Sequence, residues 1–245
     1  MYAIRTEGLT KKYKDVTAVD RLDLCVKEGE LFSLLGVNGA GKTTPIKMLT
    51  TLTRPTSGEA FLYEKSVVKD TAEVKPMIAV SPQETAVAPN LTVKENLEFI
   101  CGVYGFSKAD REKRIGELTD LLSLESVLRR RAGKLSGGWQ RRLSIAMALI
   151  SEPRILFLDE PTLGLDVIAR SELWDIIRAL KGKVTVILTT HYMEEAEALS
   201  DRVGIMKDGR LLVVATVEDI KRDTGCDRFE DAFLHIVKRE GVMKR

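Results

Sequence analysis

The chain has 245 residues, of which 44% are hydrophobic and 30% are charged, and its 38 basic residues nearly balance 36 acidic ones. This length allows one large domain or two small ones, and the net charge of +2 gives no argument for a nucleic-acid partner. Three widely spaced cysteines without a C-x-x-C pattern argue against a disulfide framework or a zinc site. No apolar run approaches the ~18 residues that span a bilayer, so any membrane part is expected on another chain.

The N-terminal part predicts two strands, over residues 2–6 and 19–26, the second with alternating apolar residues. Tyr13 lies between them among lysines, and two interpretations stay open: a solvated side chain, or an aromatic platform for a flat base. The apolar run over residues 31–35 predicts a buried strand that leads into a glycine-rich loop.

That loop, residues 36–44, reads GVNGAGKTT and fits the phosphate-loop pattern G-x-x-x-x-G-K-[ST]. Glycines let successive backbone N–H groups turn toward one anion, and the following helix points its positive dipole end at the same place. Lys42 adds a charge for the outer phosphates, and the Thr43 hydroxyl is placed to bind Mg²⁺. We expect the helix to continue to about Leu52.

The rest of the chain alternates apolar strands with helices, which is typical of a doubly wound, mainly parallel α/β sheet. Residues 84–151 change to a mostly helical character, which predicts a helical subdomain inserted into this core. A helical tail is expected over about 217–245. The remaining predictions are strands over 59–63, 77–80, 155–158 and 184–188, helices over 167–180 and 193–199, and a hairpin with its Asp-Gly turn at 207–210.

Polar residues follow three of the predicted strands. Asp159 and Glu160 come directly after the strand at 155–158, where Asp159 could hold Mg²⁺ and Glu160 could polarise an attacking water. His191 ends the next buried strand and could reach a γ-phosphate. The amide of Gln83 ends another strand and could touch the metal or the water.

A second helix start with anion-binding character lies about a hundred residues after the phosphate loop. Ser136 is a good N-cap, and Gly137 and Gly138 leave the first-turn N–H groups bare. The chain thus has one phosphate loop and a second helix start that could also bind phosphate. This suggests that the second helix start binds the nucleotide of another molecule.

In these motifs the chain resembles an ATP-binding cassette (ABC) ATPase over nearly its whole length, as a single domain of residues 1–245 with an N-terminal antiparallel β part. The resemblance implies that ATP and Mg²⁺ are bound. It implies catalytic roles for Glu160, His191, Lys42 and Gln83, and metal binding by Thr43, Gln83 and Asp159. The implied nucleotide ligands are Tyr13, Gly36, Asn38, Gly39, Ala40, Gly41, Lys42, Thr43, Thr44, the signature residues Ser136, Gly137, Gly138 and Gln140, and Asp166 at the end of the D-loop.

The resemblance also implies partners. Two copies of the chain would pair head to tail around two ATP molecules, and closure would pull on an integral membrane permease through the helical subdomain. Residues 229–234 resemble the tail of subunits paired with ABC-2-type permeases, which predicts an exporter and a cytoplasmic location at the inner face of the cell membrane.

Three other functions are alternatives to this one. A soluble ABC ATPase of translation, repair or assembly is the main alternative, although the chain has neither two cassettes nor a long coiled coil. A nucleotide-binding module without turnover is opposed by Glu160 and His191. A GTPase is opposed by the lack of an Asn-Lys-x-Asp motif.

Two positions depart from the family pattern. Pro45 stands where Thr or Leu is usual, and it removes a backbone donor and crowds the carbonyl of Gly41. Two outcomes stay open: weaker nucleotide binding or turnover, or tolerance because early helix N–H groups have no intrahelical partner. Trp139 replaces a commoner Gln, Met or Gly, with little loss expected because the three residues before it are intact.

Overall fold

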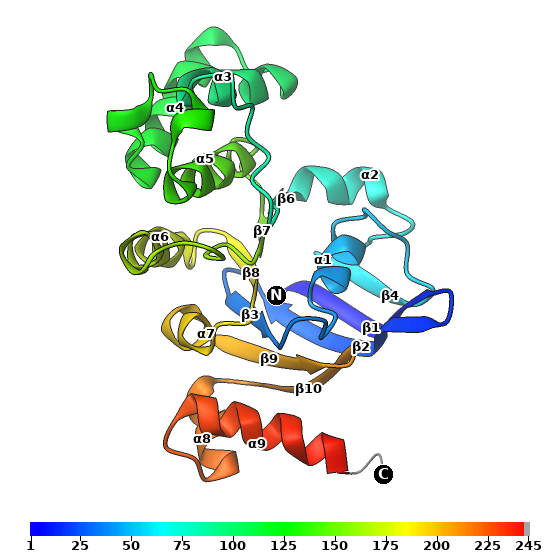
Figure 1. Cartoon of the computed structure of the whole chain (residues 1–245). Helices are drawn as coiled ribbons and strands as arrows, with labels where there is room; N and C mark the ends of the chain where they lie inside the picture. The colour runs from blue at the N-terminus through cyan, green and yellow to red at the C-terminus, as the bar shows by residue number, and fades with distance from the viewer. Residues whose placement is uncertain (243–245) are drawn as a thin grey trace.

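The computed structural model describes residues 1–242, and two sheets organise them (Figure 1). The first is antiparallel, four-stranded and mostly N-terminal, with the order β2-β1-β4-β5. Its strands are β1 (Tyr2–Tyr13), β2 (Val16–Lys27), β4 (Ser57–Leu62) and β5 (Lys65–Ser66).

The second sheet has six strands in the order β10-β9-β3-β8-β7-β6. The pairs from β9 to β6 are parallel, and β10 adds an antiparallel edge. Parallel strands end at one edge of a sheet, so the loops after β3, β7 and β8 gather there. The strands are β3 (Leu31–Leu35), β6 (Ile78–Ser81), β7 (Ile155–Asp159), β8 (Thr185–Thr190), β9 (Arg202–Lys207) and β10 (Arg210–Ala215).

Helix α1 (Thr43–Leu49) joins the two sheets. Ile46 and Leu49 are buried in one apolar cluster with Leu62 of the antiparallel sheet and with Phe157 and Ile187 of the parallel sheet. In Figure 1 the helix lies between the two sheets, directly after the phosphate loop. Burial on both sides therefore fixes the start of the helix relative to both sheets.

Three longer helices form one end of the molecule in Figure 1: α3 (Val93–Val103), α4 (Lys108–Leu122) and α5 (Gly137–Leu149). Thr92 begins α3 with a capping box to Glu95, and the Ser107 hydroxyl accepts the Asp110 N–H at the start of α4. Their apolar faces share a core with α6 (Val167–Leu180) and with one face of the parallel sheet. Helix α7 (Met193–Leu199) lies between β8 and β9 in the chain, and α8 (Val217–Thr224) and α9 (Phe229–Val242) form the opposite end.

The predicted α/β fold with an antiparallel N-terminal part is confirmed, but several bounds differ. Strand β1 continues to Tyr13, because bulged pairing with β2 extends it beyond the alternating residues. Helix α1 ends at Leu49 and not near Leu52, because Thr51 adopts a φ of 62°. Strand β5, the short helix α2 (Thr71–Val74) and the 3₁₀ turn Lys75–Met77 were not predicted.

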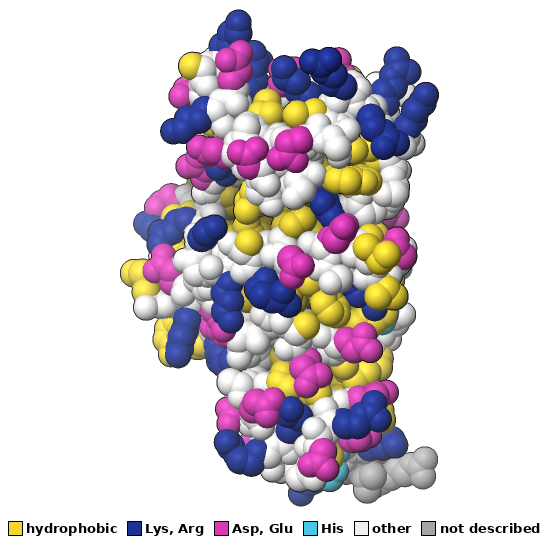
Figure 2. Space-filling model, turned by 90° about the vertical axis from the view of Figure 1, so that its left-hand side faces the viewer, with side chains coloured by type: hydrophobic (Ala, Val, Ile, Leu, Met, Phe, Trp, Pro, Cys, Tyr) yellow, Lys and Arg dark blue, Asp and Glu magenta, His cyan; other side chains and the backbone are white. Residues whose placement is uncertain are grey.

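The surface carries charges of both signs. Figure 2 shows dark blue and magenta side chains interspersed over the face that includes α6 and α7, with hydrophobic side chains between them. Among residues 1–242, no helix is both long enough and apolar enough to cross a bilayer.

Candidate functional site

The phosphate loop takes a backbone that only glycine fits at two points. Gly41 has a φ of +98°, and a Cβ there would lie 2.6 Å from the carbonyl oxygen of Ala18. A Cβ on Gly36 would lie 2.5 Å from the carbonyl oxygen of Met206. The loop is therefore pressed between β2 and the end of β9, which sets its position on the sheet edge.

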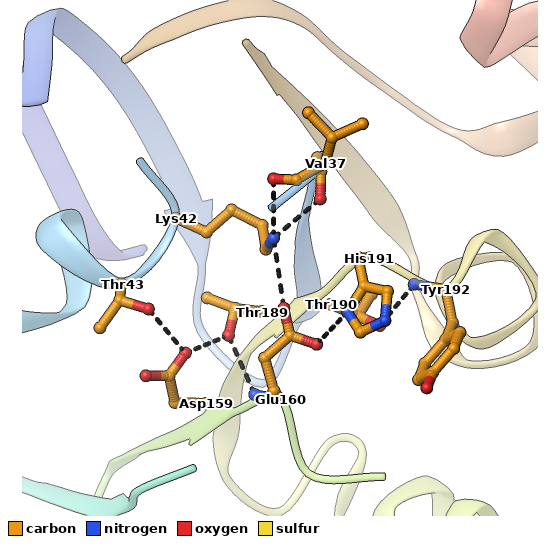
Figure 3. A network of polar contacts seen from close by, with 10 residues as sticks. Val37, Lys42, Thr43, Asp159, Glu160, Thr189, Thr190, His191 and Tyr192 are labelled. Atoms are coloured by element: carbon orange, nitrogen blue, oxygen red, sulfur yellow. Dashed lines mark hydrogen bonds and ion pairs between the residues drawn. The ribbon is translucent and has the colours of Figure 1, made fainter. Parts of the chain in front are cut away.

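Lys42 is 6% exposed and is held by the loop itself (Figure 3). Its Nζ donates to the carbonyl oxygen of Gly36 at 2.7 Å and to that of Val37 at 3.3 Å. It also lies 3.2 Å from Oε1 of Glu160. The ammonium thus stands where an outer phosphate would meet both the loop and the acidic strand end.

Asp159 ends β7 and faces the start of α1. Its Oδ1 accepts the hydroxyl of Thr43 at 3.2 Å and also that of Thr189, the neighbouring residue on β8. Asp159 is buried, with 6% of its surface exposed. The two predicted metal ligands therefore meet, and Thr189 fixes the carboxylate between them.

Glu160 leaves the strand in a left-handed conformation, with a φ of 48°. Its N–H donates to the Thr189 carbonyl at 3.1 Å and to the Thr189 hydroxyl at 3.0 Å. Its Oε2 is 2.7 Å from Nδ1 of His191. The predicted catalytic pair is thus formed, with Lys42 on the other carboxylate oxygen.

A cavity of about 670 Å³ opens above these groups. It brings together most of the predicted nucleotide and catalytic residues. The predicted residues that line it are Asn38, Gly39, Ala40, Gly41, Lys42, Thr43, Thr44, Gln83, Glu160 and His191. Gly36 and Asp159 do not line the cavity, but they are hydrogen-bonded to Lys42 and Thr43, which do.

Tyr13 lies beside the cavity and outside its lining. It is 45% exposed, pairs across the β1–β2 turn with Val16, and has the Lys11 ammonium 5.0 Å from its ring centroid. Val16 does line the cavity. The role of Tyr13 as a base platform therefore remains a prediction.

The β9–β10 turn also forms a wall of the cavity, which the sequence did not indicate. Asp208 and Gly209 line it. Gly209 donates to the carbonyl of Ala40 at 3.0 Å and accepts from the N–H of Asp20 at 2.8 Å. A Cβ on Gly209 would lie 2.8 Å from the carbonyl oxygen of Ala18. A hairpin signal predicted the turn, but only tertiary packing brings it to the site.

The signature segment lies outside this cavity. Ser136 is the N-cap residue of α5 and is exposed, but its hydroxyl caps no helix N–H, unlike the prediction of a side-chain cap. Gln140 donates to the carbonyls of Ala132 and Leu135 at 3.1 and 3.3 Å, so its amide organises the preceding turn. A single chain therefore does not bring its own signature residues to its phosphate loop.

Arg141 ties the signature helix to the segment after β6. Its guanidinium donates to the carbonyls of Pro82 and Gln83, directly beside the predicted Gln83 side chain. Burial lowers its pKa, and the Asp159 and Glu195 carboxylates oppose that shift. Arg141 was not predicted to have a role, because two consecutive arginines in a helix are typical of a solvated face.

The D-loop, residues 161–166, ends in a helix cap. The carboxylate of Asp166 accepts the N–H of Ala169 at 2.9 Å and begins α6. Its predicted nucleotide contact stays a prediction. Leu163, Val167 and Ile168 around this loop are 37%, 78% and 72% exposed.

Pro45 is the third residue of α1. The first intrahelical N–H···O bond belongs to the residue after it, so its missing N–H leaves no helix bond unmade. The carbonyl of Gly41 accepts the N–H of Thr44 at 3.2 Å. The position of Pro45 therefore favours the second of the two outcomes, in which the phosphate loop tolerates the proline.

The donor set suits a hard cation. Thr43 and Asp159 present oxygens 3.2 Å apart beside the cavity, and Gln83 adds an amide to its lining. Hydroxyl, carboxylate and amide oxygens are what Mg²⁺ accepts, usually with several waters. The described residues contain no group of three or more His, Cys, Asp or Glu side chains with metal-site geometry.

A phosphate loop on β3, an acidic pair on β7 and a histidine on β8, together with an inserted helical signature segment, define the nucleotide-binding cassette class of P-loop proteins. Residues 19–163 match the family model described as ABC transporter. The chain therefore belongs to the ABC transporter family as an ATP-binding subunit. Members of this family hydrolyse ATP.

Similar proteins support the membership of this chain in the ABC transporter family. Daunorubicin resistance ATP-binding protein DrrA3 of Streptomyces coeruleorubidus is 40% identical over 229 residues, which are 93% of this chain and 72% of that protein. Probable multidrug ABC transporter ATP-binding protein YbhF of Escherichia coli is 38% identical over 240 residues, which are 96% of this chain and 41% of that protein. A dimeric cassette solved in a post-hydrolysis state with ADP and Pi is 29% identical, with a TM-score of 0.77 over 87% of this chain and 98% of that one.

Proposed function

We propose that this chain hydrolyses ATP in a Mg²⁺-dependent reaction and so powers export through a separate membrane permease. The observation that carries the proposal is the Glu160–His191 pair at 2.7 Å, next to Lys42 in the cavity of the phosphate loop. A module that only bound nucleotide would not need this buried carboxylate and its histidine beside the lysine.

The chemistry divides among this chain's residues as follows. The loop N–H groups and Lys42 bind the phosphates and stabilise charge that develops on them. Glu160 accepts the proton of the attacking water, and His191 holds the Glu160 carboxylate in its orientation. Thr43, Asp159 and Gln83 would hold Mg²⁺, which would supply charge neutralisation at the phosphate oxygens.

A second copy of the chain would complete each site. Ser136 is exposed, its hydroxyl caps no helix N–H, and it lies outside the cavity of its own chain. A Cβ on Gly137 would touch the Leu165 side chain, so the signature turn adjoins the D-loop and its exposed apolar residues. This common face supports a head-to-tail homodimer in which Ser136, Gly137 and Gly138 bind the nucleotide of the other copy.

Export and the membrane location rest on the relatives. The similar proteins described above are named for daunorubicin resistance and for probable multidrug transport. A drug or another amphipathic compound is thus the expected class of cargo here. The chain would sit on the inner face of the cell membrane, held by the permease through the helices of residues 84–151.

The test compares the wild-type chain with Glu160→Gln and with Glu194→Gln, an exposed control on α7. Phosphate release from ATP is measured with Mg²⁺ and with a chelator, and size-exclusion is run in ATP. We expect Glu160→Gln to lose turnover about a hundredfold or more and to run as a dimer, while the control stays active. Unchanged turnover in Glu160→Gln would refute the assigned chemistry.

The transport role is tested separately. We expect the chain to co-purify with an integral membrane protein, and its turnover to rise in membranes that hold this partner. Stimulation by ribosomes or DNA and not by membranes would favour the soluble ATPase instead.

A further inference from the structure

Helix α7 carries a buried carboxyl group that the mechanism above does not use. Glu195 lies four residues after His191 and is 0% exposed, whereas Glu194 and Glu197 on the same helix are exposed. Burying a carboxyl group is costly unless hydrogen bonds compensate it. Its surroundings therefore indicate what it holds in place.

Three segments of the site meet at this carboxyl group. Its Oε1 accepts the indole N–H of Trp174 on α6 at 3.1 Å. The hydroxyls of Thr190 and Thr162 lie close enough to lower the pKa of this carboxyl group, and both residues are 0% exposed. Thr190 precedes His191, Thr162 follows Glu160 by two residues in the D-loop, and α6 continues the D-loop.

The Thr190 hydroxyl extends the link to the histidine. It accepts the backbone N–H of Tyr192 at 3.0 Å, so it spans the peptide units on both sides of His191 (Figure 3). Since the Thr190 hydroxyl also lies near Glu195, it connects this carboxyl group with the backbone around His191, whose Nδ1 is 2.7 Å from Oε2 of Glu160.

The D-loop side of the link is incomplete in the single chain. Within residues 1–242, Oε2 of Glu195 and Oγ1 of Thr162 are buried and have no hydrogen bond of normal geometry. The Thr162 hydroxyl is nevertheless close enough to influence the carboxyl group. A small movement of the D-loop toward α7 would pair these two oxygens, provided that one of them carries a hydrogen toward the other.

The charges around Glu195 favour a neutral group. Burial raises its pKa most, the Thr190 and Thr162 hydroxyls and the Trp174 indole lower it, and the nearby Glu160 carboxylate raises it further. The Arg141 guanidinium is an opposite charge that interacts with Glu195. A neutral carboxyl can accept the indole N–H on one oxygen and donate to a threonine from the other.

We propose that Glu195 is a positioning residue for hydrolysis, which couples the D-loop through Thr162 to the segment that carries His191. Docking of a second copy against the D-loop would complete the Thr162–Glu195 bond and fix His191 against Glu160. The inference rests on the proposed ATP hydrolysis and adds a residue outside the motifs that predicted it.

The test is steady-state ATP hydrolysis by Glu195→Ala, Glu195→Gln and Thr162→Val, with Glu194→Ala as the exposed control on the same helix. We expect Glu195→Ala and Thr162→Val to lower kcat about tenfold with KM within about twofold, since phosphate contacts are untouched. Glu195→Gln keeps the shape and both hydrogen-bonding functions, so it should recover at least about half of the wild-type kcat. Thr162→Val removes one hydroxyl at constant shape and keeps the test decisive if Glu195→Ala does not fold.

A double-mutant cycle with His191→Ala separates positioning from general support of the fold. If Glu195 acts through the histidine, Thr162→Val lowers the residual rate of His191→Ala by less than about twofold. Independent losses that multiply, or a kcat of both single variants equal to that of Glu194→Ala, would overturn the inference. The same series measures ATP turnover by the wild-type chain and its loss in Glu160→Gln. If the wild-type chain shows no such turnover, the proposed function is refuted instead.

Discussion

Replacing Pro45 by alanine tests how the phosphate loop depends on the helix behind it. Pro45 is buried as the third residue of α1, where a backbone N–H has no intrahelical acceptor. The loop N–H groups that face phosphate belong to residues before it. We therefore expect the substitution to change stability and to leave ATP affinity within about twofold.

The magnitude follows from two terms. Proline restricts the unfolded chain, and losing that restriction costs about 0.4–1 kcal/mol where the native φ suits proline. Alanine also lacks two of the buried methylene groups of the ring, at about 0.8 kcal/mol each. The free energy of unfolding should fall by about 2 kcal/mol in all, which lowers the Tm of a chain of this size by roughly 4–8 °C.

Urea unfolding and calorimetric titration with ATP-Mg²⁺ measure the two quantities on the same sample. Gly41→Ala serves as the contrasting variant, because a Cβ there would lie 2.6 Å from the Ala18 carbonyl oxygen at a φ of +98°. It should lose measurable ATP binding. A Pro45→Ala chain of unchanged stability that binds ATP about tenfold more tightly would refute the reasoning, because the ring would then be distorting the loop.

Three further changes should have distinct effects. Burial raises the pKa of Glu195 above its ordinary 4.5, so the folded state binds this proton more tightly than the unfolded state does. The free energy of unfolding of the wild-type chain, relative to that of Glu195→Gln, should therefore fall as pH rises from about 4.5 to the raised pKa, by up to about 1.4 kcal/mol per pH unit in urea unfolding. Arg141→Met leaves the Pro82 and Gln83 carbonyls without donors and should destabilise the chain by about 3 kcal/mol in the same assay. Ser136→Ala should leave ATP binding by the single chain unchanged in titration, yet lower phosphate release about a hundredfold.

Much of the site could be predicted because its chemistry is local in sequence. The loop at 36–44 and the pair Asp159-Glu160 each follow a continuous apolar run, and such runs are typical of strands buried on both faces. Parallel strands then bring their carboxyl ends together whatever lies between them in the chain. His191 and Glu160 are 31 residues apart and yet within hydrogen-bonding distance for this reason.

The remaining features depend on tertiary contacts that leave no local signal. Glu195 belongs to an acidic stretch, MEEAEAL, that is typical of an exposed helix. Its burial and its hydrogen bond from the indole of Trp174 depend on how α7 packs against α6. Helix α1 is shorter than predicted because the backbone turns at Thr51, a residue type that gives no warning of a positive φ. Strand β1 extends to Tyr13 through pairing with bulges, which has no periodic pattern to detect.

The hairpin turn at Asp208 and Gly209 has a practical consequence for anyone who modifies this chain. Hairpin tips are usually where a fold accepts an epitope, a fluorophore or a circular permutation. Here the tip is a wall of the nucleotide cavity, bonded to Ala40 and pressed against Ala18. An insertion at this turn would change the shape of that cavity, so reporter groups belong elsewhere, for example at the exposed residues 104–105 between α3 and α4.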